Sequence, residues 1–360
     1  MKILIVSGSS GGHIFPAISL IKALKSEYNV SDILLVLPRQ NAVSGRRDFC
    51  CAVKYIPASP ITARLSFKNL KNIFYFAAAF FESFFIIASF KPDAVAGFGG
   101  LASIPVILSA WLFRIRTVIH EQNVLPGKAN KFLAGFSGKI AVSFKETAGL
   151  FKGYEKKVVF TGNPIRQGLT RSAKKDALDF FKLEYNKLTL LVMGGSQGCR
   201  NLNKAVPQVI SKLPQKDKIQ VIHLCGDKDY DFVNEQYNLS GVVSRSFKFL
   251  DAVSYAYSAS DLVISRSGAS TIAELIKFKV PALLVPYPYA GAHQAQNAMV
   301  LSRADCAIIV GDDCLEKGQF KEAMASLISS PERLAVMTDN YRVFADIDAA
   351  GLLAGEVVKC

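Results

Sequence analysis

The chain has 360 residues, which exceeds a typical single domain, so we expect two domains. Half of its residues are hydrophobic, which excludes a disordered chain, and 43 basic against 29 acidic side chains give a net charge of +14, which favours a polyanionic partner. The seven scattered cysteines contain no C-x-x-C pair, and no RNP-type motif or long basic run occurs, so we expect no zinc site, no disulfide framework and no nucleic-acid partner.

The first half of the chain alternates predicted strands with predicted helices. Its opening run, residues 2–7, leads directly into glycines, so it predicts a first strand and not a signal peptide. Pro16 favours a helix that begins near it and ends at about residue 26. Further strands are expected at 33–37, 53–56, 94–97, 117–120, 139–143 and 158–161, and further helices at 67–90, 104–113 and 127–136.

The alternation restarts after a turn-rich segment at 162–166. Helices are expected at 172–183 and from about 337, and strands at 188–193, 219–224, 242–246, 261–265 and 282–285. We therefore predict the α/β class, with two Rossmann-like domains whose parallel sheets face each other across a cleft. The expected division is an N-terminal domain at 1–163, a C-terminal domain at 164–340 and a terminal helix at 341–360 that packs back on the N-terminal domain.

Two glycine-rich loops follow predicted strands. The loop at 194–203, GGSQGCRNLN, leads into a helix, whose backbone N–H groups and dipole favour a phosphate. The loop at 8–13, GSSGGH, lacks the glycine spacing of a dinucleotide fingerprint, so an ordinary turn is the alternative. His13 ends this loop and is suited to act as a base or to bind a sugar or phosphate.

Polar clusters follow three other predicted strands. Residues 120–123, His-Glu-Gln-Asn, are expected to face the same site as His13, with a turn and capping cluster as the alternative. Glu274 suits a ribose diol, or else forms a capping box with Thr271. The amides of Gln294 and Asn297 are suited to a base or to sugar hydroxyls.

An acidic stretch contains Asp227, Asp229 and Asp231, which resemble a D-x-D metal motif. A calcium loop would need glycine and glutamate where Phe232 and Asn238 stand. We therefore expect a solvated loop with a helix cap.

The phenylalanine-rich segment 67–90 approaches the length that spans a bilayer, but Glu82 and Ser83 interrupt it. We expect a helix that docks on a membrane surface, and a plain core helix is the alternative. The expected membrane patch is Phe74, Phe81, Phe85 and Trp111, with Arg114 and Arg116 at its rim.

Seven stretches together resemble the MurG family of peptidoglycan N-acetylglucosaminyltransferases, which belongs to the GT-B class. They are GSSGGHIFPA (8–17), GFGG (97–100), HEQNVLPGKAN (120–130), GNPIR (162–166), GGSQGCRNLN (194–203), SRSGASTIAEL (265–275) and HQAQNA (293–298). The resemblance implies an inverting transfer of N-acetylglucosamine from UDP-N-acetylglucosamine to the C4 hydroxyl of the MurNAc sugar of lipid I. The product is lipid II, and no metal or other cofactor is expected.

The resemblance also implies roles for single residues. His13 is the expected catalytic base and Glu121 the second candidate. Leu250 meets the uracil through its backbone, Glu274 holds the ribose hydroxyls, and Asn123 faces the acceptor as well as the donor. The full set of expected donor-binding residues is Asn123, Arg166, Ser196, Gln197, Leu250, Ser270, Glu274, Gln294 and Asn297. The expected acceptor or phosphate loops contain Ser10, Gly11, Gly12, Gly99 and Gly100.

The implied location is the cytoplasmic face of the bacterial plasma membrane, where the protein is peripheral and has lipid I and an anionic membrane surface as partners. Two alternatives remain. One is another UDP-sugar enzyme of the same fold, such as a diacylglycerol glycosyltransferase or a UDP-sugar epimerase. The other is a nucleotide-sugar-binding protein without catalysis.

Overall fold

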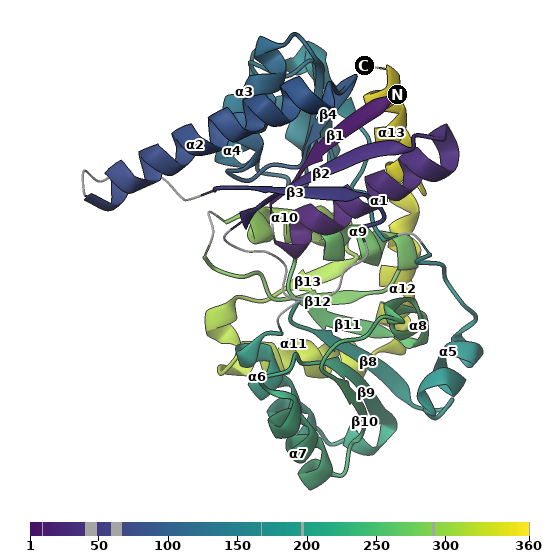
Figure 1. Ribbon diagram of the computed structural model, residues 1–360. Coiled ribbons are helices and arrows are strands. Elements are labelled where there is room, and N and C mark those ends of the chain that lie inside the picture. The colour runs from purple at the N-terminus through teal and green to yellow at the C-terminus, as the bar shows by residue number, and fades with distance from the viewer. Residues whose placement is uncertain are drawn as a thin grey trace. The chain divides into compact units, whose positions relative to one another are not determined.

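The structure, a computed structural model, describes residues 1–8, 10–39, 49–58, 67–166, 168–195, 198–289 and 292–359, with the side chains of 67–73 excepted. The chain forms two compact units (Figure 1). Unit 1 comprises Met1–Gln167 and Ile347–Cys360, and unit 2 comprises Gly168–Asp346. The terminal helix α13 therefore belongs to unit 1.

Unit 1 is built on a parallel sheet with the order β3-β2-β1-β4-β5-β6-β7. The inner strands are continuous apolar runs because both faces of a parallel sheet are covered. The strands are β1 (Lys2–Val6), β2 (Asp32–Pro38), β3 (Ala52–Ile56), β4 (Ala94–Gly97), β5 (Arg116–Glu121), β6 (Lys139–Val142) and β7 (Val158–Phe160).

The helices of unit 1 cover both faces of this sheet. Helices α1 and α13 bury Leu20 and Leu353 against Ile3 and Ile5, whereas α2, α3 and α4 pack on the face that carries Leu4. The helices are α1 (Gly11–Tyr28), α2 (Phe67–Phe90), α3 (Ser103–Leu112), α4 (Lys128–Leu133) and α13 (Ala349–Lys359), with 3₁₀ turns η2 (Lys145–Leu150) and η3 (Glu155–Lys157).

Unit 2 repeats the design with the order β10-β9-β8-β11-β12-β13, again all parallel. The predicted pair of parallel Rossmann-like sheets is thus confirmed. The strands are β8 (Leu188–Met193), β9 (Ile219–Leu224), β10 (Val243–Phe247), β11 (Leu262–Ser265), β12 (Ala282–Leu284) and β13 (Ala307–Ile309).

The core of unit 2 joins α6, α7, α11 and α12 to the β8 side chains of Leu190 and Val192. Elsewhere Tyr257 of α8 stacks on Phe278 of α9, with ring centroids 4.9 Å apart. The helices are α5 (Lys174–Phe181), α6 (Arg200–Ser211), α7 (Tyr230–Ser240), α8 (Val253–Ala259), α9 (Ala269–Phe278), α10 (His293–Arg303), α11 (Gly318–Ile328) and α12 (Pro331–Asn340), with turns η4 (Lys216–Lys218), η5 (Asp312–Cys314) and η6 (Tyr341–Val343).

Two predicted boundaries are wrong. Helix α1 begins at Gly11, five residues before Pro16, so Gly11, Gly12 and His13 form its first turn. Pro16 has no backbone N–H, so one hydrogen bond within α1 is missing. The helix tolerates this loss because Pro16 lies near its start. The continuous helix expected from about residue 337 is also interrupted.

The interruption has two visible causes. Helix α12 ends at Asn340, where the buried Tyr341 donates its hydroxyl to the Val280 carbonyl at 2.8 Å and anchors the turn. Helix α13 starts afresh because the Asp348 carboxylate accepts the Gly351 N–H at 3.1 Å, as an N-cap side chain does.

The segment 67–90 forms one helix, α2, as predicted. Glu82 lies at its side and pairs with Arg39, at 3.0 Å from the guanidinium. Among the helices that the structure describes, none is long and apolar enough to cross a membrane.

Candidate functional site

Each sheet has one point at which the strand order reverses, and α/β proteins bind ligands outside the carboxyl ends of the strands at such points. In unit 1 the reversal lies between β1 and β4, and in unit 2 between β8 and β11. Each of these four strands ends in one of the loops singled out in the sequence. The topology therefore collects the candidate residues at one edge of each sheet.

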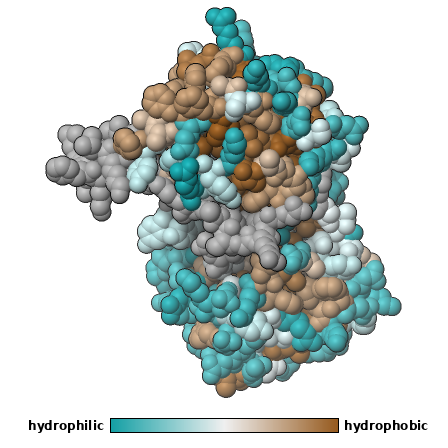
Figure 2. All heavy atoms as spheres, viewed as in Figure 1, coloured by the Kyte–Doolittle hydropathy of each residue, from teal (hydrophilic) through white to brown (hydrophobic). Residues whose placement is uncertain are grey.

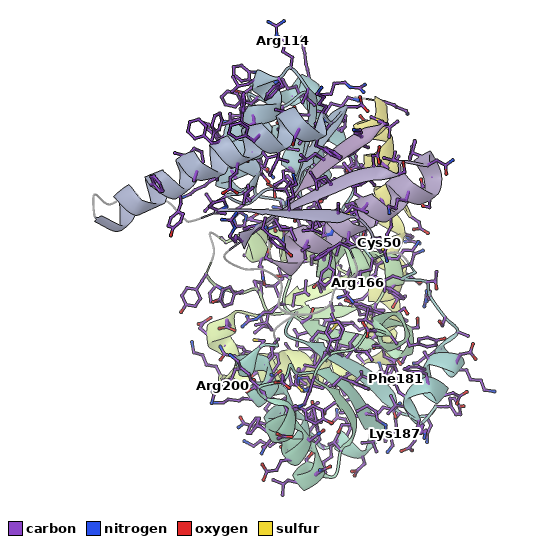
Figure 3. The ribbon with its side chains drawn as sticks, in the orientation of Figure 1. Cys50, Arg114, Arg166, Phe181, Lys187 and Arg200 are labelled. Atoms are coloured by element: carbon purple, nitrogen blue, oxygen red, sulfur yellow. The ribbon has the colours of Figure 1, made fainter. Side chains whose placement is uncertain are left out.

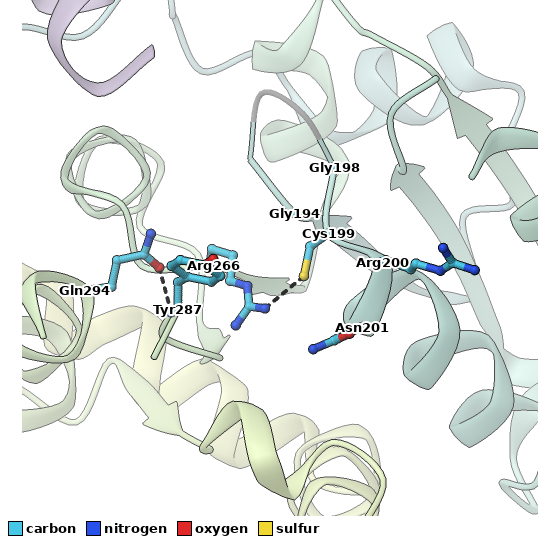
Figure 4. A pocket seen from close by; sticks show the side chains of 8 residues that line it. All are labelled: Gly194, Gly198, Cys199, Arg200, Asn201, Arg266, Tyr287 and Gln294. Carbon is cyan, nitrogen blue, oxygen red and sulfur yellow. Dashed lines mark hydrogen bonds between the residues drawn. The ribbon is translucent and has the colours of Figure 1, made fainter. Parts of the chain in front are cut away.

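In unit 2 the reversal point holds a cavity of about 310 Å³ (Figure 4). Its wall combines the loop after β8, the first turn of α6 and side chains from the ends of β11 and β12. The lining residues are Gly194, Gly198, Cys199, Arg200, Asn201, Arg266, Tyr287 and Gln294. A cavity lined by a glycine-containing loop and the start of a helix suits an anionic ligand.

The glycines of this loop are required by its geometry. A Cβ on Gly194 would lie 2.2 Å from the Cys199 nitrogen. Gly198 has φ +76° and packs so closely on the Cys225 carbonyl that a Cβ would lie 2.1 Å from its oxygen. A side chain at either position would collide with backbone atoms, so both positions require glycine, a residue that lets a backbone approach a phosphate closely. Ser196 and Gln197, expected at the diphosphate, lie outside the described residues.

Other predicted donor residues surround the same sheet edge. Gln294, in the first turn of α10, accepts the backbone N–H of Tyr287 at 2.9 Å and of Ser267 at 3.3 Å, so it lines the cavity and fixes its rim. Asn297 is fully buried behind it and donates to the Ser267 carbonyl at 3.3 Å. The structure therefore brings Gln294 to the cavity, whereas Asn297 supports the loop beneath.

Glu274 lies on α9, where Tyr257 donates its hydroxyl to the carboxylate at 2.8 Å. The capping-box alternative is wrong, because α9 begins at Ala269 with Gly268 as its N-cap residue, and Glu274 is therefore too far along the helix. Ser270, in the first turn of α9, has a buried hydroxyl without a hydrogen-bond partner. Leu250 is buried just beyond β10.

Arg266 and Tyr287 of the cavity wall were not among the predicted site residues, and Cys199 was predicted only as part of the loop at 194–203. Arg266 and Cys199 stand in quoted motifs, SRSG and GGSQGC, so their position after a strand was a usable signal. Tyr287 carries no such signal, and its place depends on how the chain after β12 turns toward the cavity.

In unit 1 the two glycine loops touch. A Cβ on Gly100, which has φ +79°, would lie 3.3 Å from the Gly8 Cα. Ser10 precedes α1, and its hydroxyl lies 2.9 Å from Nδ1 of His13. Gly8 also leaves room for the imidazole, since a Cβ there would lie 2.8 Å from that nitrogen. The loops after β1 and β4 thus form one surface that carries His13.

Glu121, at the end of β5, is buried and fully engaged. One carboxylate oxygen accepts the Asn123 N–H at 2.9 Å and its side-chain amide at 3.3 Å. The other accepts the Gly127 N–H at 2.9 Å and the Asn130 amide at 2.8 Å. Asn130 in turn lies against Gly99. The carboxylate therefore organises the 121–130 turn, in which Asn123 is partly exposed.

His120 is a buried structural histidine. Its Nε2–H donates to the Gly162 carbonyl at 3.0 Å, since a carbonyl can only accept, and Nδ1 then accepts from the Gln122 amide at 3.2 Å. Burial lowers the pKa of His120 to about 4, and the Gly162 hydrogen bond opposes part of that shift. His120 is therefore neutral at pH 7 and joins β5 to the 162–166 turn.

Two further predictions concern polar side chains outside these loops. Arg166 packs its guanidinium over the Phe15 ring of α1 at 4.2 Å. Asp227 pairs with Lys248 at 3.0 Å, and Asp229 accepts from the Asn203 amide at 2.8 Å. Asp229 stands at the N-cap of α7 but makes no side-chain cap bond, so that part of the expected cap is wrong.

Exposed aromatic side chains gather on α2, α3 and α4. Phe74, Phe81 and Phe85 are 73%, 62% and 67% exposed, so the plain core-helix alternative is wrong. Ring contacts extend the surface. The ring centroids of Phe84 and Phe113 are 4.7 Å apart, and that of Phe136 lies 5.3 Å from those of both Trp111 and Phe132. We call the exposed members of this surface the aromatic patch: Phe74, Phe81, Phe85, Trp111, Phe113 and Phe132.

Figure 2 shows hydrophobic residues gathered on this part of unit 1. Arg114, next to the aromatic patch, extends away from the body of unit 1 (Figure 3). Arg116, at the start of β5, and Lys128 and Lys131 of α4 are also exposed. The surface thus combines exposed rings with basic side chains.

Comparisons with known proteins agree with this geometry. Residues 3–142 match the glycosyltransferase family 28 N-terminal domain, and residues 189–351 match the glycosyltransferase family 28 C-terminal domain. The two matches fall on units 1 and 2.

Two curated relatives carry the name UDP-N-acetylglucosamine--N-acetylmuramyl-(pentapeptide) pyrophosphoryl-undecaprenol N-acetylglucosamine transferase. The one from Thermodesulfovibrio yellowstonii is 36% identical over 94% of this chain and 92% of its own length. The one from Halothermothrix orenii is 34% identical over 95% and 94%. The crystal structure of Acinetobacter baumannii MurG superposes with a TM-score of 0.78, at 24% identity over all of both chains, and so shares the GT-B fold. The chain is therefore a glycosyltransferase of family 28 and belongs to the MurG family of N-acetylglucosamine transferases.

Proposed function

We propose that the chain transfers N-acetylglucosamine from UDP-N-acetylglucosamine to the C4 hydroxyl of the MurNAc sugar of lipid I, which produces lipid II for peptidoglycan synthesis. The observation that carries the proposal is the glycine-walled cavity at the β8/β11 reversal point, which suits a sugar diphosphate. The names of relatives that are at least 34% identical over nearly the whole chain support this donor and acceptor.

In this proposal unit 2 binds the donor. The diphosphate meets the backbone N–H groups around 194–199 and the start of α6, with Ser196, Gln197 and Ser270 as expected hydroxyl and amide donors. Glu274 takes the ribose hydroxyls, beside its hydrogen bond from Tyr257, and Leu250 takes the uracil. Gln294 is the expected contact of the sugar, and Arg166 is the expected contact of the nucleotide. The developing charge on the leaving UDP is then stabilised by dipoles that are already oriented.

Unit 1 supplies the proton acceptor, and we assign that role to His13. Ser10 can accept a hydrogen bond from Nδ1–H of His13, and in this tautomer Nε2 carries the lone pair that can take a proton. Nε2 takes the proton as the C4 oxygen bonds to the anomeric carbon and the bond to the UDP oxygen breaks. A single displacement of this kind inverts the anomeric configuration.

Glu121 is the weaker candidate for this step because its carboxylate already accepts four hydrogen bonds. We assign it to positioning Asn123 and the Gly99–Gly100 loop. We also propose that no metal ion is required. The support is that the D-x-D carboxylates are engaged elsewhere, with Lys248 and Asn203.

We further propose that the aromatic patch docks on the cytoplasmic face of the plasma membrane, where an undecaprenyl-linked acceptor is embedded. Exposed rings enter the interface between headgroups and acyl chains, and neighbouring basic residues attract anionic lipids. The net charge of +14 favours the same surface. The protein is then peripheral, bound by unit 1.

The deciding experiment follows labelled N-acetylglucosamine from UDP-N-acetylglucosamine to a lipid I analogue. We expect a disaccharide product, and the same assay with EDTA is expected to give the same rate. Binding of the donor without turnover would favour the non-catalytic alternative. Conversion of the donor to an epimer, without transfer, would favour the epimerase.

A further inference from the structure

Arg266 is a buried hub in the wall of the unit 2 cavity. It is 7% exposed and follows β11 directly. Its Nη1 donates to the carbonyls of Val285 and Pro286 at 3.0 and 3.2 Å, and its Nη2 donates to the Cys199 sulfur at 3.0 Å. The guanidinium also lies 5.5 Å from the centre of the Tyr287 ring. Figure 4 shows Arg266 pointing toward Cys199, whereas Arg200 points away.

The charge of this guanidinium is neutralised by one carboxylate. Oδ1 of Asp312, in the turn after β13, lies 2.6 Å from Nη2 of Arg266, and the two side chains are 13% and 8% exposed. The other oxygen, Oδ2, accepts from the Asn201 amide in the first turn of α6 at 3.0 Å. Asp312 therefore reaches the loop after β8 by two routes, through Arg266 to Cys199 and through Asn201 to α6.

We propose that Asp312 is a positioning residue that holds Arg266 in the cavity wall. Backbone N–H groups then bind the nucleoside diphosphate. The diphosphate leaves as product because no unpaired guanidinium retains it. This inference rests on the proposed function, since it takes the cavity as the site of the diphosphate. Its consequence is that a carboxylate outside every sequence motif sets the affinity of the site for its product.

The physical reason is the cost of an uncompensated buried charge. When one partner of a buried ion pair is removed, the remaining ion gains from any new counter-charge. Without the Asp312 carboxylate, a diphosphate in the cavity that Arg266 lines can supply the missing counter-charge. The variant site should therefore bind UDP more tightly, through an interaction that salt screens.

The experiment compares UDP binding to the full-length protein and to Asp312→Asn by titration calorimetry at 50 and 500 mM salt. We expect UDP to bind Asp312→Asn about tenfold more tightly than wild type at 50 mM, with most of the gain lost at 500 mM. In the transfer assay, the inhibition constant of UDP as product should fall by the same factor. A merely structural role would lower the fraction of competent protein and leave these constants unchanged.

Asp313→Asn is the matched control. Asp313 is the next residue and is exposed, and its carboxylate pairs with Lys317 at 3.0 Å and accepts from the Cys314 sulfur at 3.7 Å. We expect wild-type UDP affinity and salt dependence for this variant. An equal gain in Asp313→Asn would reduce the effect to net charge and overturn the inference.

The double variant Arg266→Gln, Asp312→Asn keeps the test decisive if Asp312→Asn folds poorly, because it leaves no unpaired buried charge. We expect it to bind UDP within about threefold of wild type, with the same salt dependence. A tenfold loss would mean that Arg266 contacts the diphosphate directly, which contradicts the inference. If the wild-type protein bound no UDP, the proposed function would be wrong. If Asp312→Asn had the wild-type dissociation and inhibition constants for UDP, only this inference would be wrong.

Discussion

His13 and Glu121 differ in burial and in the hydrogen bonds described for them. His13 stands in the first turn of α1, partly buried, with Nδ1 beside the Ser10 hydroxyl. Glu121 is 2% exposed and surrounded by four donors. The two candidates for one chemical role can therefore be separated by experiment.

We predict that His13→Ala lowers the turnover of the transfer reaction by about 10²- to 10⁴-fold, which is what a positioned general base contributes. UDP affinity should stay within about twofold of wild type, because the proposed donor residues are mostly in unit 2. Ser10→Ala, which removes only the partner of Nδ1, should cause a smaller loss. Turnover of His13→Ala within threefold of wild type would exclude His13 as the base.

Glu121→Gln should act on stability first. Glutamine replaces one accepting oxygen by a donor, so two of the four present N–H partners would face an N–H group. Each buried donor left unsatisfied costs about 1–3 kcal/mol. Denaturant unfolding should therefore show a loss of a few kcal/mol, and the pH dependence of the remaining turnover should keep its wild-type midpoint. A variant with unchanged stability and no turnover would instead make Glu121 the base.

At the scale of elements, α2 exposes its rings on one side. Phe74, Phe81 and Phe85 are seven and four residues apart, a spacing that returns to the same face of a helix. Contacts of Phe84 with Phe113 join α2 to the end of α3. The aromatic patch is thus a surface made by several helices of unit 1.

We predict that Phe81→Ser with Phe85→Ser weakens binding to vesicles that contain anionic lipid by at least tenfold, since each ring is more than 60% exposed and is available to the bilayer. Co-sedimentation measures the effect. Phe180→Ser is the control, because Phe180 is an exposed ring, 52%, on α5 of unit 2. Equal losses in both variants, or no loss in the double variant, would argue against docking by this patch.

Most elements were predictable because each carries a local signal. Leu188–Met193 is a continuous apolar run before two glycines, and its predicted strand is confirmed to the residue. The start of α1 was missed because Pro16 marks an early turn, whereas the capping geometry at Ser10 decides the first residue. Strand β13, only Ala307–Ile309, is too short to show a period.

The candidate site was likewise predictable only where its residues leave a local pattern in the sequence. The glycine loops were found because phosphate binding and tight turns leave a local pattern. The ion pair of Arg266 and Asp312 was not, because it joins residues 46 positions apart through the order of strands β11, β12 and β13. The saturation of Glu121 by Asn123, Gly127 and Asn130 was equally invisible, since it depends on how the turn folds back.

At the scale of the whole molecule, each unit contains one fully buried histidine that burial keeps neutral. In unit 1 this is His120. In unit 2 it is His223, whose Nε2–H donates to the side-chain Oδ1 of Asn203 at 3.0 Å. Its Nδ1 accepts from the Tyr237 hydroxyl at 3.0 Å. Burial lowers the pKa of His223 to about 3. Both units should therefore share one response to acid.

The direction of that response follows from the pKa values. Above pH 6.5 both histidines are neutral whether the chain is folded or unfolded, so their contribution to stability is fully present. Below pH 6.5 the unfolded chain binds a proton at each histidine, but the folded chain does not until about pH 4 at His120 and about pH 3 at His223. The free energy of unfolding should therefore fall by roughly 1 kcal/mol per pH unit for each histidine over this range.

We predict that His223→Gln removes this dependence from unit 2 and leaves it in unit 1. Glutamine can still donate to Asn203 and accept from Tyr237, but it takes up no proton in the unfolded chain. The measurement is denaturant unfolding at pH 7.5 and 5.5, followed by hydrogen exchange at amides of β9 for unit 2 and β5 for unit 1. Acidification should lower the protection of β9 less in the variant than in wild type, with β5 affected equally in both. If β9 lost the same protection in both proteins, the acid sensitivity of unit 2 would have to arise from its carboxylates instead of His223.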